Sequence, residues 1–255
     1  MSAAGTADAS TLAGWLRSAE RVVVLTGAGI STESGIPDFR GPDGVWTRDP
    51  AAERRSSIEA YRRDGRLRQQ VWQERLHHPA WTAAPNAGHL ALAALERQGR
   101  LELLVTQNID GLHRLAGSSP ERLIEIHGTL REVTCLQCQR RGPMEAALAR
   151  VRAGEADPRC LGCGGLLKSA TISFGQPLVA RDLHRAEAAA RACDCFWAVG
   201  TSLTVHPVAR LPALALEAGA HLVVVNQQPT PYDRLAAAVV RERIGAVLPE
   251  VVARL

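Results

Sequence analysis

The amino-acid sequence predicts an α/β fold, with a doubly wound, parallel, Rossmann-like sheet and a smaller inserted domain made of a helical module and a zinc-ribbon module. Short apolar runs of the length of buried strands alternate with alanine- and leucine-rich patterns of helical period. Two segments, 42–80 and 131–175, interrupt this alternation. The second contains two Cys-x-x-Cys pairs, a spacing typical of a small zinc-binding module.

The alternation of apolar runs with helical patterns predicts the strands and helices in chain order. The apolar runs predict strands at 21–25, 101–106, 122–126, 195–199 and 221–225. The helical patterns lie at 10–20, 88–98, 183–192, 207–218 and 230–240. We expect a flexible tail at 1–10 and a Rossmann-like domain built from 11–41, 85–130 and 176–255. The small domain combines a helical module, 42–84, with a zinc-binding module, 131–175.

Composition and charge narrow the function classes. The 255 residues are 46% hydrophobic, and no run approaches the roughly 18 apolar residues of a membrane span. The first ten residues lack the regions of a signal peptide, so we expect a cytoplasmic protein with no membrane partner. The net charge of +4 does not indicate direct nucleic-acid binding, and the arginines of 53–78 alternate with acids, as on a solvated helical face. We expect a monomer.

Four of the six cysteines have the spacing of a structural metal site. Cys135 and Cys138 form one pair, and Cys160 and Cys163 form the other. In a cytoplasmic chain two such turns bring four thiolates together tetrahedrally, which favours zinc over disulfides. Cys193 and Cys195 lie in an apolar run, and we expect both to be buried thiols.

Each predicted strand is followed by residues suited to ligand binding. The carboxyl ends of parallel strands meet at one edge of a sheet, where ligands of open α/β folds bind. We therefore expect a ligand site there, built from glycines, small hydroxyls, amides, an acid and histidine. The segments that follow the five strands are Thr26–Gly29, Gln107–His113, His127–Gly128, Gly200–Ser202 and Asn226.

The first of these segments resembles a dinucleotide-binding turn. Its glycines, Gly27 and Gly29, let backbone N–H groups approach a pyrophosphate. Position 32 is threonine instead of the usual third glycine, and no ribose-binding acid follows at the usual distance. The sequence therefore predicts a dinucleotide bound in an unusual way.

Two histidines differ in their expected roles. His127 stands at a strand end, and histidine exchanges a proton near neutrality, so it is the candidate general base. His113 falls in the first turn of a predicted helix, and we expect it to be a structural hydrogen-bonding partner.

Together the motifs resemble the sirtuin family of NAD-dependent protein-lysine deacylases. The segments GAGISTESGIPDFRG, TQNIDGLH, HG, SFG, GTSLTVHP and VVNQQPT occur in that family's order, with the paired cysteines among them. The resemblance runs from about residue 15 to about residue 235. It implies a bacterial-type protein with a single catalytic domain, NAD as co-substrate, an acetyl-lysine protein or peptide as partner, and a structural zinc ion.

The resemblance also implies residue roles. The acyl oxygen of the substrate lysine would displace nicotinamide, His127 would then deprotonate a ribose hydroxyl, and Asn108 would order the ribose and a water molecule. The products would be nicotinamide, free lysine and 2′-O-acetyl-ADP-ribose. The peptide would pair with Ile172, Phe174, Gly175 and Val205 by β-augmentation. The NAD-binding residues would be Gly27, Ala28, Gly29, Ile30, Asp38, Phe39, Arg40, Gln107, Asn108, Ile109, Asp110, Gly200, Thr201, Ser202 and Asn226.

Two departures from the family pattern concern the substrate. Gln176 stands where many members have glutamate, which bears on peptide preference more than on chemistry. Members that prefer succinyl- or malonyl-lysine carry a tyrosine and an arginine three residues apart, near Arg75 and His78 here. Because that pattern is lacking, the sequence predicts neutral acyl groups, acetyl first.

Several alternative functions stay open. One is NAD-dependent ADP-ribosyl transfer to a protein, against which an intact His127 favours deacylation. Removal of longer acyl groups is a second. A nucleic-acid-binding zinc ribbon is a third, although only 4% of residues are aromatic. NAD sensing without turnover is a fourth, and it would require a lost catalytic group.

Overall fold

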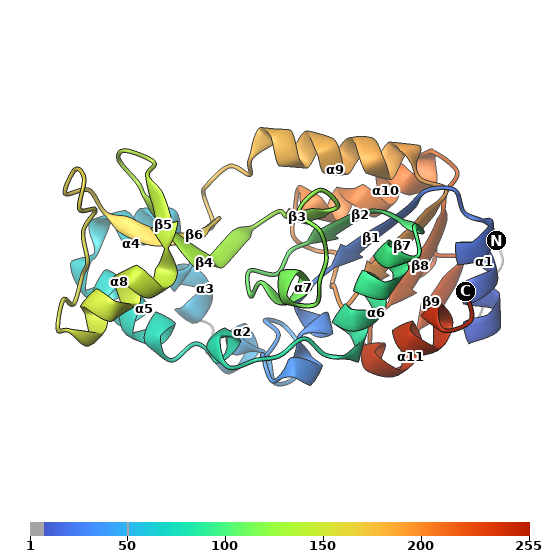
Figure 1. The fold of residues 1–255 in the computed structure, drawn as a ribbon, viewed down its shortest axis with the longest axis horizontal. Helices are drawn as coiled ribbons and strands as arrows, with labels where there is room; N and C mark the ends of the chain where they lie inside the picture. The colour runs from blue at the N-terminus through green and yellow to red at the C-terminus, as the bar shows by residue number, and fades with distance from the viewer. Residues whose placement is uncertain (1–7, 50) are drawn as a thin grey trace.

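The computed structural model describes residues 8–49 and 51–255, which form two lobes (Figure 1). Its α-helices are α1 (Ala9–Ser18), α2 (Val45–Arg48), α3 (Ala51–Arg55), α4 (Ile58–Arg63), α5 (Gly65–Leu76), α6 (Ala87–Arg97), α7 (Leu112–Leu115), α8 (Met144–Arg152), α9 (Ala180–Ala192), α10 (Leu211–Glu217) and α11 (Ile244–Val252). The 3₁₀ helices are η1 (Ala28–Ile30), η2 (Thr32–Ser34), η3 (Pro79–Trp81) and η4 (Val208–Arg210).

The larger lobe contains a six-stranded parallel sheet in the order β3-β2-β1-β7-β8-β9. This is the strand order of the doubly wound Rossmann fold, so the predicted fold class is confirmed. The chain moves outward from β1 to β3 and then crosses to β7, so the order reverses between β1 and β7. The strands are β1 (Val22–Thr26), β2 (Leu101–Thr106), β3 (Leu123–Glu125), β7 (Cys195–Val199), β8 (His221–Val225) and β9 (Ala238–Val240).

Helices cover both faces of this sheet (Figure 1). Successive residues of β1 point to opposite faces, so Val22 and Val24 enter one apolar core while Val23 and Leu25 enter the other. The first core is closed by α1, α6 and α11, and the second by α9 and α10. Burial on both faces explains why the strands are continuous apolar runs in the sequence.

The smaller lobe contains a three-stranded antiparallel sheet in the order β5-β4-β6. Its strands are β4 (Gly128–Cys135), β5 (Arg141–Pro143) and β6 (Leu167–Thr171). Trp72 of α5 and Met144 and Leu148 of α8 pack into its own apolar core. Because β4 starts directly after His127, this lobe is joined to the ligand edge of the large sheet.

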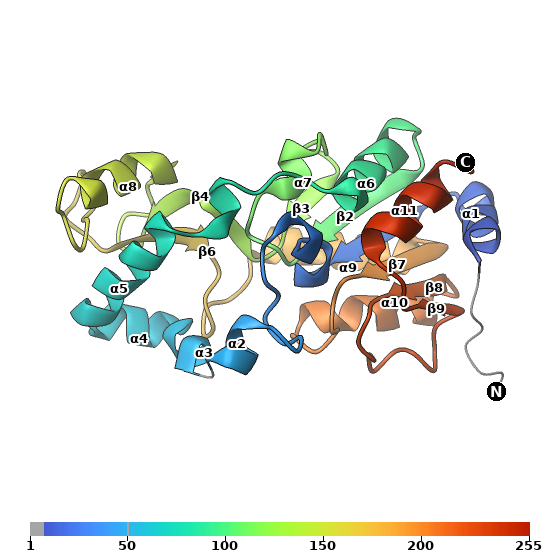
Figure 2. The ribbon, with the colours of Figure 1, turned by 90° about the horizontal axis from the view of Figure 1, so that it is seen from below.

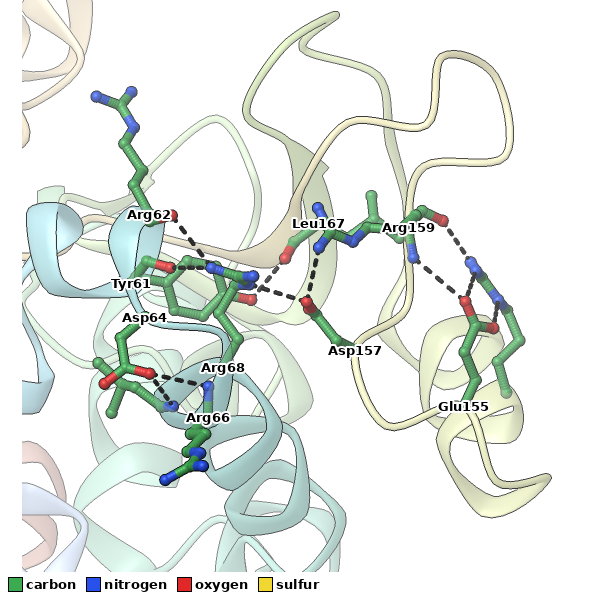
Figure 3. Close-up of polar contacts among 11 residues, drawn as sticks. Tyr61, Arg62, Asp64, Arg66, Arg68, Glu155, Asp157, Arg159 and Leu167 are labelled. Atoms are coloured by element: carbon green, nitrogen blue, oxygen red, sulfur yellow. Dashed lines mark hydrogen bonds and ion pairs between the residues drawn. The ribbon is translucent and has the colours of Figure 1, made fainter.

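A buried ion pair fastens the helical module to the cysteine-containing module (Figure 3). Arg68 Nε of α5 lies 3.0 Å from Asp157 Oδ2, and the side chains are 9% and 14% exposed. Arg68 also donates to the carbonyl of Tyr61, whose hydroxyl donates to the Leu167 carbonyl at 2.5 Å. These contacts fix α4 and α5 against β6.

Two predictions from the sequence differ from the structure. The predicted helix at 230–240 is wrong: residues 231–235 form turns, and 238–240 is the edge strand β9. Proline at 229 and 231 and the Thr230–Asp233 hydrogen bonds stop a helix, while β8 offers a free edge to Ala238–Val240. The solvated face predicted at 53–78 is wrong for Arg68 and Arg75, which point inward.

Only part of the predicted N-terminal tail lies within the residues that the structure describes. Residues 1–7 of the predicted tail lie outside the described residues. Helix α1 begins at Ala9, because Asp8 caps it by accepting a hydrogen bond from Thr11 N at 2.8 Å. Within the described ranges, no helix combines the length and apolar character needed to cross a bilayer.

Candidate active site

The candidate site lies at the carboxyl edge of the large sheet, where the strand order reverses between β1 and β7. Ligands of doubly wound sheets bind in the crevice at such a point. Gly27 follows β1 and Gly200 follows β7, so two glycine turns meet there. The topology therefore brings together segments that are far apart in the sequence.

The two glycine turns pack directly on each other. Gly27 N–H donates to Val199 O at 3.0 Å, and Gly29 N–H donates to Gly200 O at 2.9 Å. A Cβ at Gly27 would lie 2.7 Å from Gly200 O, and one at Gly29 would lie 2.8 Å from Gly200 Cα. Glycine is thus required for close backbone approach. These two N–H groups are already bonded, and the role of donating to a pyrophosphate falls to neighbouring groups such as Ala28 N–H.

Asn108 is held at the floor of the site by neighbouring groups. Its Nδ2 donates to Gly27 O at 3.0 Å and to Ser31 Oγ at 3.1 Å. Ser31 Oγ in turn donates to Asp110 Oδ2 at 2.7 Å, while Asp110 Oδ1 accepts from Leu112 N at 2.8 Å. Both amide protons of Asn108 are therefore used, and its Oδ1 remains to accept a hydrogen bond from a ligand.

A second layer of polar groups supports this floor. Thr26 Oγ1 contacts Thr106 Oγ1 at 2.8 Å and His113 Nε2 at 2.9 Å. The rings of His113 and His89 lie 4.8 Å apart, and both residues are fully buried. Burial lowers the pKa of His89 to about 4 and that of His113 well below its usual value, so both are neutral at pH 7. The structural role expected for His113 agrees with these contacts.

His127 occupies the end of β3 with a fixed tautomer. Its Nδ1 lies 3.0 Å from the main-chain oxygen of Gln107, which can only accept, so Nδ1 carries the proton of the neutral ring. Burial lowers the pKa of His127, and the hydrogen bond to Gln107 offsets part of this shift. The ring is therefore neutral at pH 7, and its Nε2 is free to accept a proton.

The segment after η2 contributes an aromatic cluster. The rings of Phe39 and Trp46 lie 4.8 Å apart, and those of Trp46 and Phe174 lie 5.7 Å apart. The Arg40 guanidinium lies 4.4 Å from the centre of the Trp46 ring. Asp38 Oδ1 closes the adjacent turn by accepting from Gly41 N at 2.9 Å. The cluster ties the loop that carries Asp38, Phe39 and Arg40 to the predicted substrate strand.

That substrate strand already has one edge paired. Phe174 N–H donates to Ser56 O and Ile58 N–H donates to Phe174 O, both at 3.0 Å. Gln176 Oε1 accepts from Ser173 N at 2.9 Å and closes the turn that follows. A peptide therefore has to pair with the opposite edge, on which Gly175 lies. It can also contact the side chain of Phe174, which is 41% exposed.

One cavity of about 1170 Å³ joins the predicted residues. It exceeds the roughly 300–1000 Å³ of a single small-molecule pocket, so two ligands fit side by side. Ile30 is the exception among the predicted residues: it is 1% exposed and packs in the core beside α6. The predicted residues that line the cavity are Gly27, Ala28, Gly29, Asp38, Phe39, Arg40, Gln107, Asn108, Ile109, Asp110, His127, Ile172, Phe174, Gly175, Gly200, Thr201, Ser202, Val205 and Asn226.

The remaining strand-end side chains are fixed by local hydrogen bonds. Gln107 Nε2 donates to Thr201 Oγ1 at 2.8 Å and joins the ends of β2 and β7. Ser202 Oγ lies 2.9 Å from Thr204 Oγ1, and Asn226 Nδ2 donates to Gln228 O at 2.8 Å. The polar lining of the cavity is therefore largely formed before a ligand binds.

The four predicted cysteines converge at the far end of the small lobe. Their sulfur atoms all lie within 4.8 Å of one another, with 3.5 Å between Cys135 and Cys163 and 3.7 Å between Cys138 and Cys160. A disulfide requires about 2.05 Å, whereas four thiolates at about 2.3 Å from one zinc ion lie roughly 3.8 Å apart. The donor set fits zinc, and with four thiolates no position is left for a substrate.

Three further residues contribute to the site and were not predicted from the sequence. Ser31, which lies inside the glycine segment after β1, links Asn108 to Asp110. Trp46 lies between the loop and the substrate strand. Arg131 holds the Asp110 carbonyl through its Nε at 3.1 Å and the Ala80 carbonyl through a guanidinium nitrogen at 3.0 Å. A lone tryptophan or arginine in a helical or strand pattern gives no signal of such a role.

Comparison with known proteins adds an independent finding. Residues 27–207 match the family model described as the Sir2 family. A protein of Streptomyces coelicolor, named NAD-dependent protein deacetylase 2, is 53% identical over 228 residues, which cover 89% of this chain and 95% of the relative. A protein of Sulfolobus acidocaldarius, named NAD-dependent protein deacetylase, is 40% identical over 97% of this chain and 95% of its own.

Solved structures give the same result. A Sir2 structure with a deacetylated p53 peptide and 3′-O-acetyl ADP ribose superposes with a TM-score of 0.89 at 31% identity, covering 96% of this chain and 97% of the other. The crystal structure of a Sir2 homolog–NAD complex superposes with a TM-score of 0.86 at 35% identity, covering 98% and 94%. At these coverages the likeness extends over both lobes.

Proposed function

The chain belongs to the Sir2 family, and we propose on this basis which of its residues bind NAD, bind the acetylated peptide and carry out the reaction. The protein is an NAD-dependent protein-lysine deacetylase. NAD, water and an acetyl-lysine side chain are converted into nicotinamide, free lysine and 2′-O-acetyl-ADP-ribose. NAD is therefore a co-substrate that is consumed in each cycle.

The single observation that supports the assignment of the base is the fixed tautomer of His127. With its Nδ1 proton donated to Gln107, Nε2 is the ring nitrogen left to take the proton of a ribose hydroxyl. After nicotinamide has left, the deprotonated ribose oxygen attacks the carbon of the substrate's acyl group. His127 then returns the proton to the departing lysine amine, so the residue is unchanged at the end of the cycle.

The other catalytic residue that we propose is Asn108. Its two amide protons are held by Gly27 and Ser31, so its Oδ1 accepts from a ribose hydroxyl or from the attacking water. Orientation of this kind lowers the barrier because a reacting group is held in place before the reaction. Asp110 and the backbone of Ile109 would hold the nicotinamide amide in the same region.

For NAD and the peptide we propose the cavity-lining residues named above. Ile30 contributes to NAD binding only indirectly, because its side chain supports η1 from the core. Phe39 and Arg40 would cover the nicotinamide ribose and the phosphates. Gly175 and Val205 would pair with the extended peptide.

The zinc ion is structural. Cys135 and Cys138 at the end of β4, together with Cys160 and Cys163, would hold it, and its contribution is to fold the small lobe. None of the four thiols lines the cavity, so no proton transfer in the reaction involves them.

We further propose that the domain boundaries are those predicted from the sequence, with 42–84 and 131–175 as the inserted domain. A cytoplasmic location, a monomeric state and the absence of direct nucleic-acid or membrane binding are part of the same proposal. The modest net charge of +4 and the low aromatic content support the absence of direct nucleic-acid binding.

A mass-spectrometric assay tests the function. The wild type and His127→Ala are incubated with an acetyl-lysine peptide, with and without NAD. We expect NAD-dependent loss of acetyl, formation of O-acetyl-ADP-ribose, and loss of about 10²–10⁴-fold in rate for the variant. Addition of ADP-ribose to a protein without deacetylation would instead assign the protein to ADP-ribosyl transfer.

A further inference from the structure

Arg131 of β4 connects three segments around the residues that we propose for nicotinamide. Its Nε donates to the Asp110 carbonyl oxygen at 3.1 Å, and a terminal guanidinium nitrogen donates to the Ala80 carbonyl oxygen at 3.0 Å. The guanidinium carbon lies 5.3 Å from the centre of the Trp81 ring. The chain between α5 and α6, which contains η3, passes beside β4 on its way from one lobe to the other (Figure 2). The side chain thus joins the loop after β2, β4 and η3.

The donors of Arg131 serve main-chain oxygens. Within the described residues Arg131 forms no ion pair, and the Asp110 carboxylate accepts instead from Ser31 Oγ and Leu112 N. A guanidinium carries its N–H groups in a fixed planar fork, so it can hold two carbonyl oxygens in one geometry, which an ammonium cannot do. The half-buried Arg131 therefore contributes the geometry of this fork more than the pairing of its charge.

A main-chain hydrogen bond acts beside the arginine. Leu130 N–H donates to the Ile109 carbonyl oxygen at 2.8 Å. Two consecutive residues of β4 thus hold two consecutive carbonyl groups of the loop, those of Ile109 and Asp110. In a planar trans peptide unit the N–H points opposite to the C=O. The Asp110 N–H, which shares a unit with the Ile109 carbonyl, therefore points away from β4.

The loop offers donors that the protein itself does not use. In the part of the chain that the structure describes, the N–H groups of Ile109 and Asp110 have no hydrogen-bond partner. Asp110 is only 5% exposed, and both residues line the cavity. Buried main-chain N–H groups are nearly always paired, so these two are suited to a ligand acceptor. A carboxamide oxygen is such an acceptor.

Packing on Gly111 is a separate sign that the arginine and the loop fit each other. Gly111 has a φ of +78°, a conformation that favours glycine. A Cβ built on it would lie 3.1 Å from Arg131 Nε and 3.2 Å from Arg131 Cγ. The side chain of Arg131 therefore lies directly against the end of the loop. The conformation of the loop and the place of the arginine depend on each other.

We propose that Arg131 is a positioning residue for nicotinamide: it fixes the peptide units of Ile109–Gly111 so that their N–H groups meet the carboxamide of NAD. The proposal rests on the proposed function, which places nicotinamide at Ile109 and Asp110. Arg131 does not line the cavity, so it acts through Asp110 and touches no reacting atom. The reaction and its balance stay as described above.

The test measures inhibition of deacetylation by two fragments of NAD, nicotinamide and ADP-ribose. Nicotinamide occupies only the subsite in question, whereas ADP-ribose occupies the remainder of the NAD site. An inhibition constant does not depend on the fraction of the protein that is folded, so partial unfolding of a variant does not change it. We expect Arg131→Met to raise the inhibition constant of nicotinamide about tenfold and to leave that of ADP-ribose unchanged.

Two further variants separate geometry from charge and from general effects. Arg131→Lys keeps the positive charge but lacks the fork that bridges Asp110 and Ala80, so we expect it to raise the constant for nicotinamide nearly as much as Arg131→Met. Arg141→Met is the matched control. Arg141 belongs to the neighbouring strand β5, its side chain is 56% exposed and it pairs with Glu132. This variant should leave both constants unchanged.

Four results overturn the proposal. They are an unchanged constant for nicotinamide in Arg131→Met, equal rises of both constants in that variant, a wild-type ratio of the constants in Arg131→Lys, and an equal rise for nicotinamide in Arg141→Met. Removal of acetyl-lysine with an unchanged ratio in Arg131→Met refutes this inference and leaves the proposed function standing. Absence of turnover by the wild type refutes the proposed function instead.

A second measurement needs no turnover. Each protein is saturated with ADP-ribose, and the line widths of the ring protons of added nicotinamide are followed by ¹H NMR. We expect broadening with the wild type and with Arg141→Met, and much less with Arg131→Met at the same concentrations. Equal broadening with all three proteins would show that the nicotinamide subsite forms without Arg131.

Discussion

The imidazole of His127 and the main-chain carbonyl of Gln107 are joined by a hydrogen bond of 3.0 Å. The bond spans the ends of β3 and β2, two neighbouring strands of the parallel sheet. The orientation of the base is therefore set by the sheet before a ligand binds. It also makes Nε2 the nitrogen that exchanges a proton with a substrate.

The burial of the same imidazole predicts the pH dependence of deacetylation. Burial lowers the pKa of His127 below the ordinary value of about 6.5. The neutral, active form therefore persists as the pH falls to 6.5, and activity is lost only below it. We expect the acid limb of kcat for an acetyl peptide at saturating NAD to have its midpoint under 6.5. A midpoint clearly above that value would mean that the base is stabilised in its charged form.

A second prediction concerns the packed glycine turns. In Gly27→Ala the new Cβ meets Gly200 O at 2.7 Å and Thr201 Cβ at 2.8 Å, both parts of a buried turn. We expect a loss of roughly 1–3 kcal/mol in the free energy of unfolding and weaker NAD binding. The measurements are urea denaturation and titration with NAD.

Gly14→Ala is the matched control for Gly27→Ala. Gly14 lies within α1, and a Cβ there would meet nothing within 4 Å. Removing a helix-interior glycine should stabilise the protein by about 0.5–1 kcal/mol and leave NAD binding unchanged. Equal effects of the two substitutions would show that the close approach between the turns is not what requires Gly27.

The parts of the fold and site that follow from local patterns were predictable from the sequence. Parallel strands buried on both faces are apolar throughout, so β1, β2 and β7 are visible as runs. Their carboxyl ends must share an edge, which is why Gly27, Asn108 and Gly200 could be placed together. The sulfur atoms of the paired cysteines could also be placed together, because few groups other than a metal ion bring four thiols into one site.

The remaining features of the fold and the site depend on contacts between residues that are far apart in the sequence, which no local pattern predicts. Gly27 and Gly29 form hydrogen bonds with β7 and with the turn after it, because segments about 170 residues apart pack together. The edge strand β9 lies in an alanine-rich segment with helical propensity, and pairing with β8 overrides that propensity. Arg75 falls within the predicted solvated face because a sequence does not show which cations are turned inward.

Removal of zinc is expected to affect the small lobe first. Cys135 pairs with Leu167 in the β4–β6 ladder, and both belong to the small core around Trp72. We expect Cys160→Ser or a strong chelator to remove zinc, lower the melting temperature and raise KM for the peptide more than for NAD. The peptide strand continues directly from β6, which explains this order of effects.

Zinc content by mass spectrometry, melting curves and the two KM values check this expectation. Cys193→Ala is the control, because Cys193 is a buried thiol that donates to the Ala190 carbonyl and lies outside the cluster. It should keep one zinc ion per chain. Full activity in a zinc-free Cys160→Ser protein would show that the metal does not support the substrate strand.

The ion pair of Arg68 and Asp157 leads to a last prediction. Removing one partner of a buried pair leaves an uncompensated charge and costs about 3 kcal/mol, whereas replacing both with apolar residues is close to neutral. Arg159 stays beside Asp157, so we expect Arg68→Met to cost about 3 kcal/mol and Arg68→Met/Asp157→Leu to recover most of it. Arg66→Met, on the exposed side of α5, should stay within about 0.5 kcal/mol of wild type. Urea denaturation of the wild type, Arg68→Met, Asp157→Leu and the double variant measures the coupling, and additive effects would mean that the joint is held by apolar packing alone.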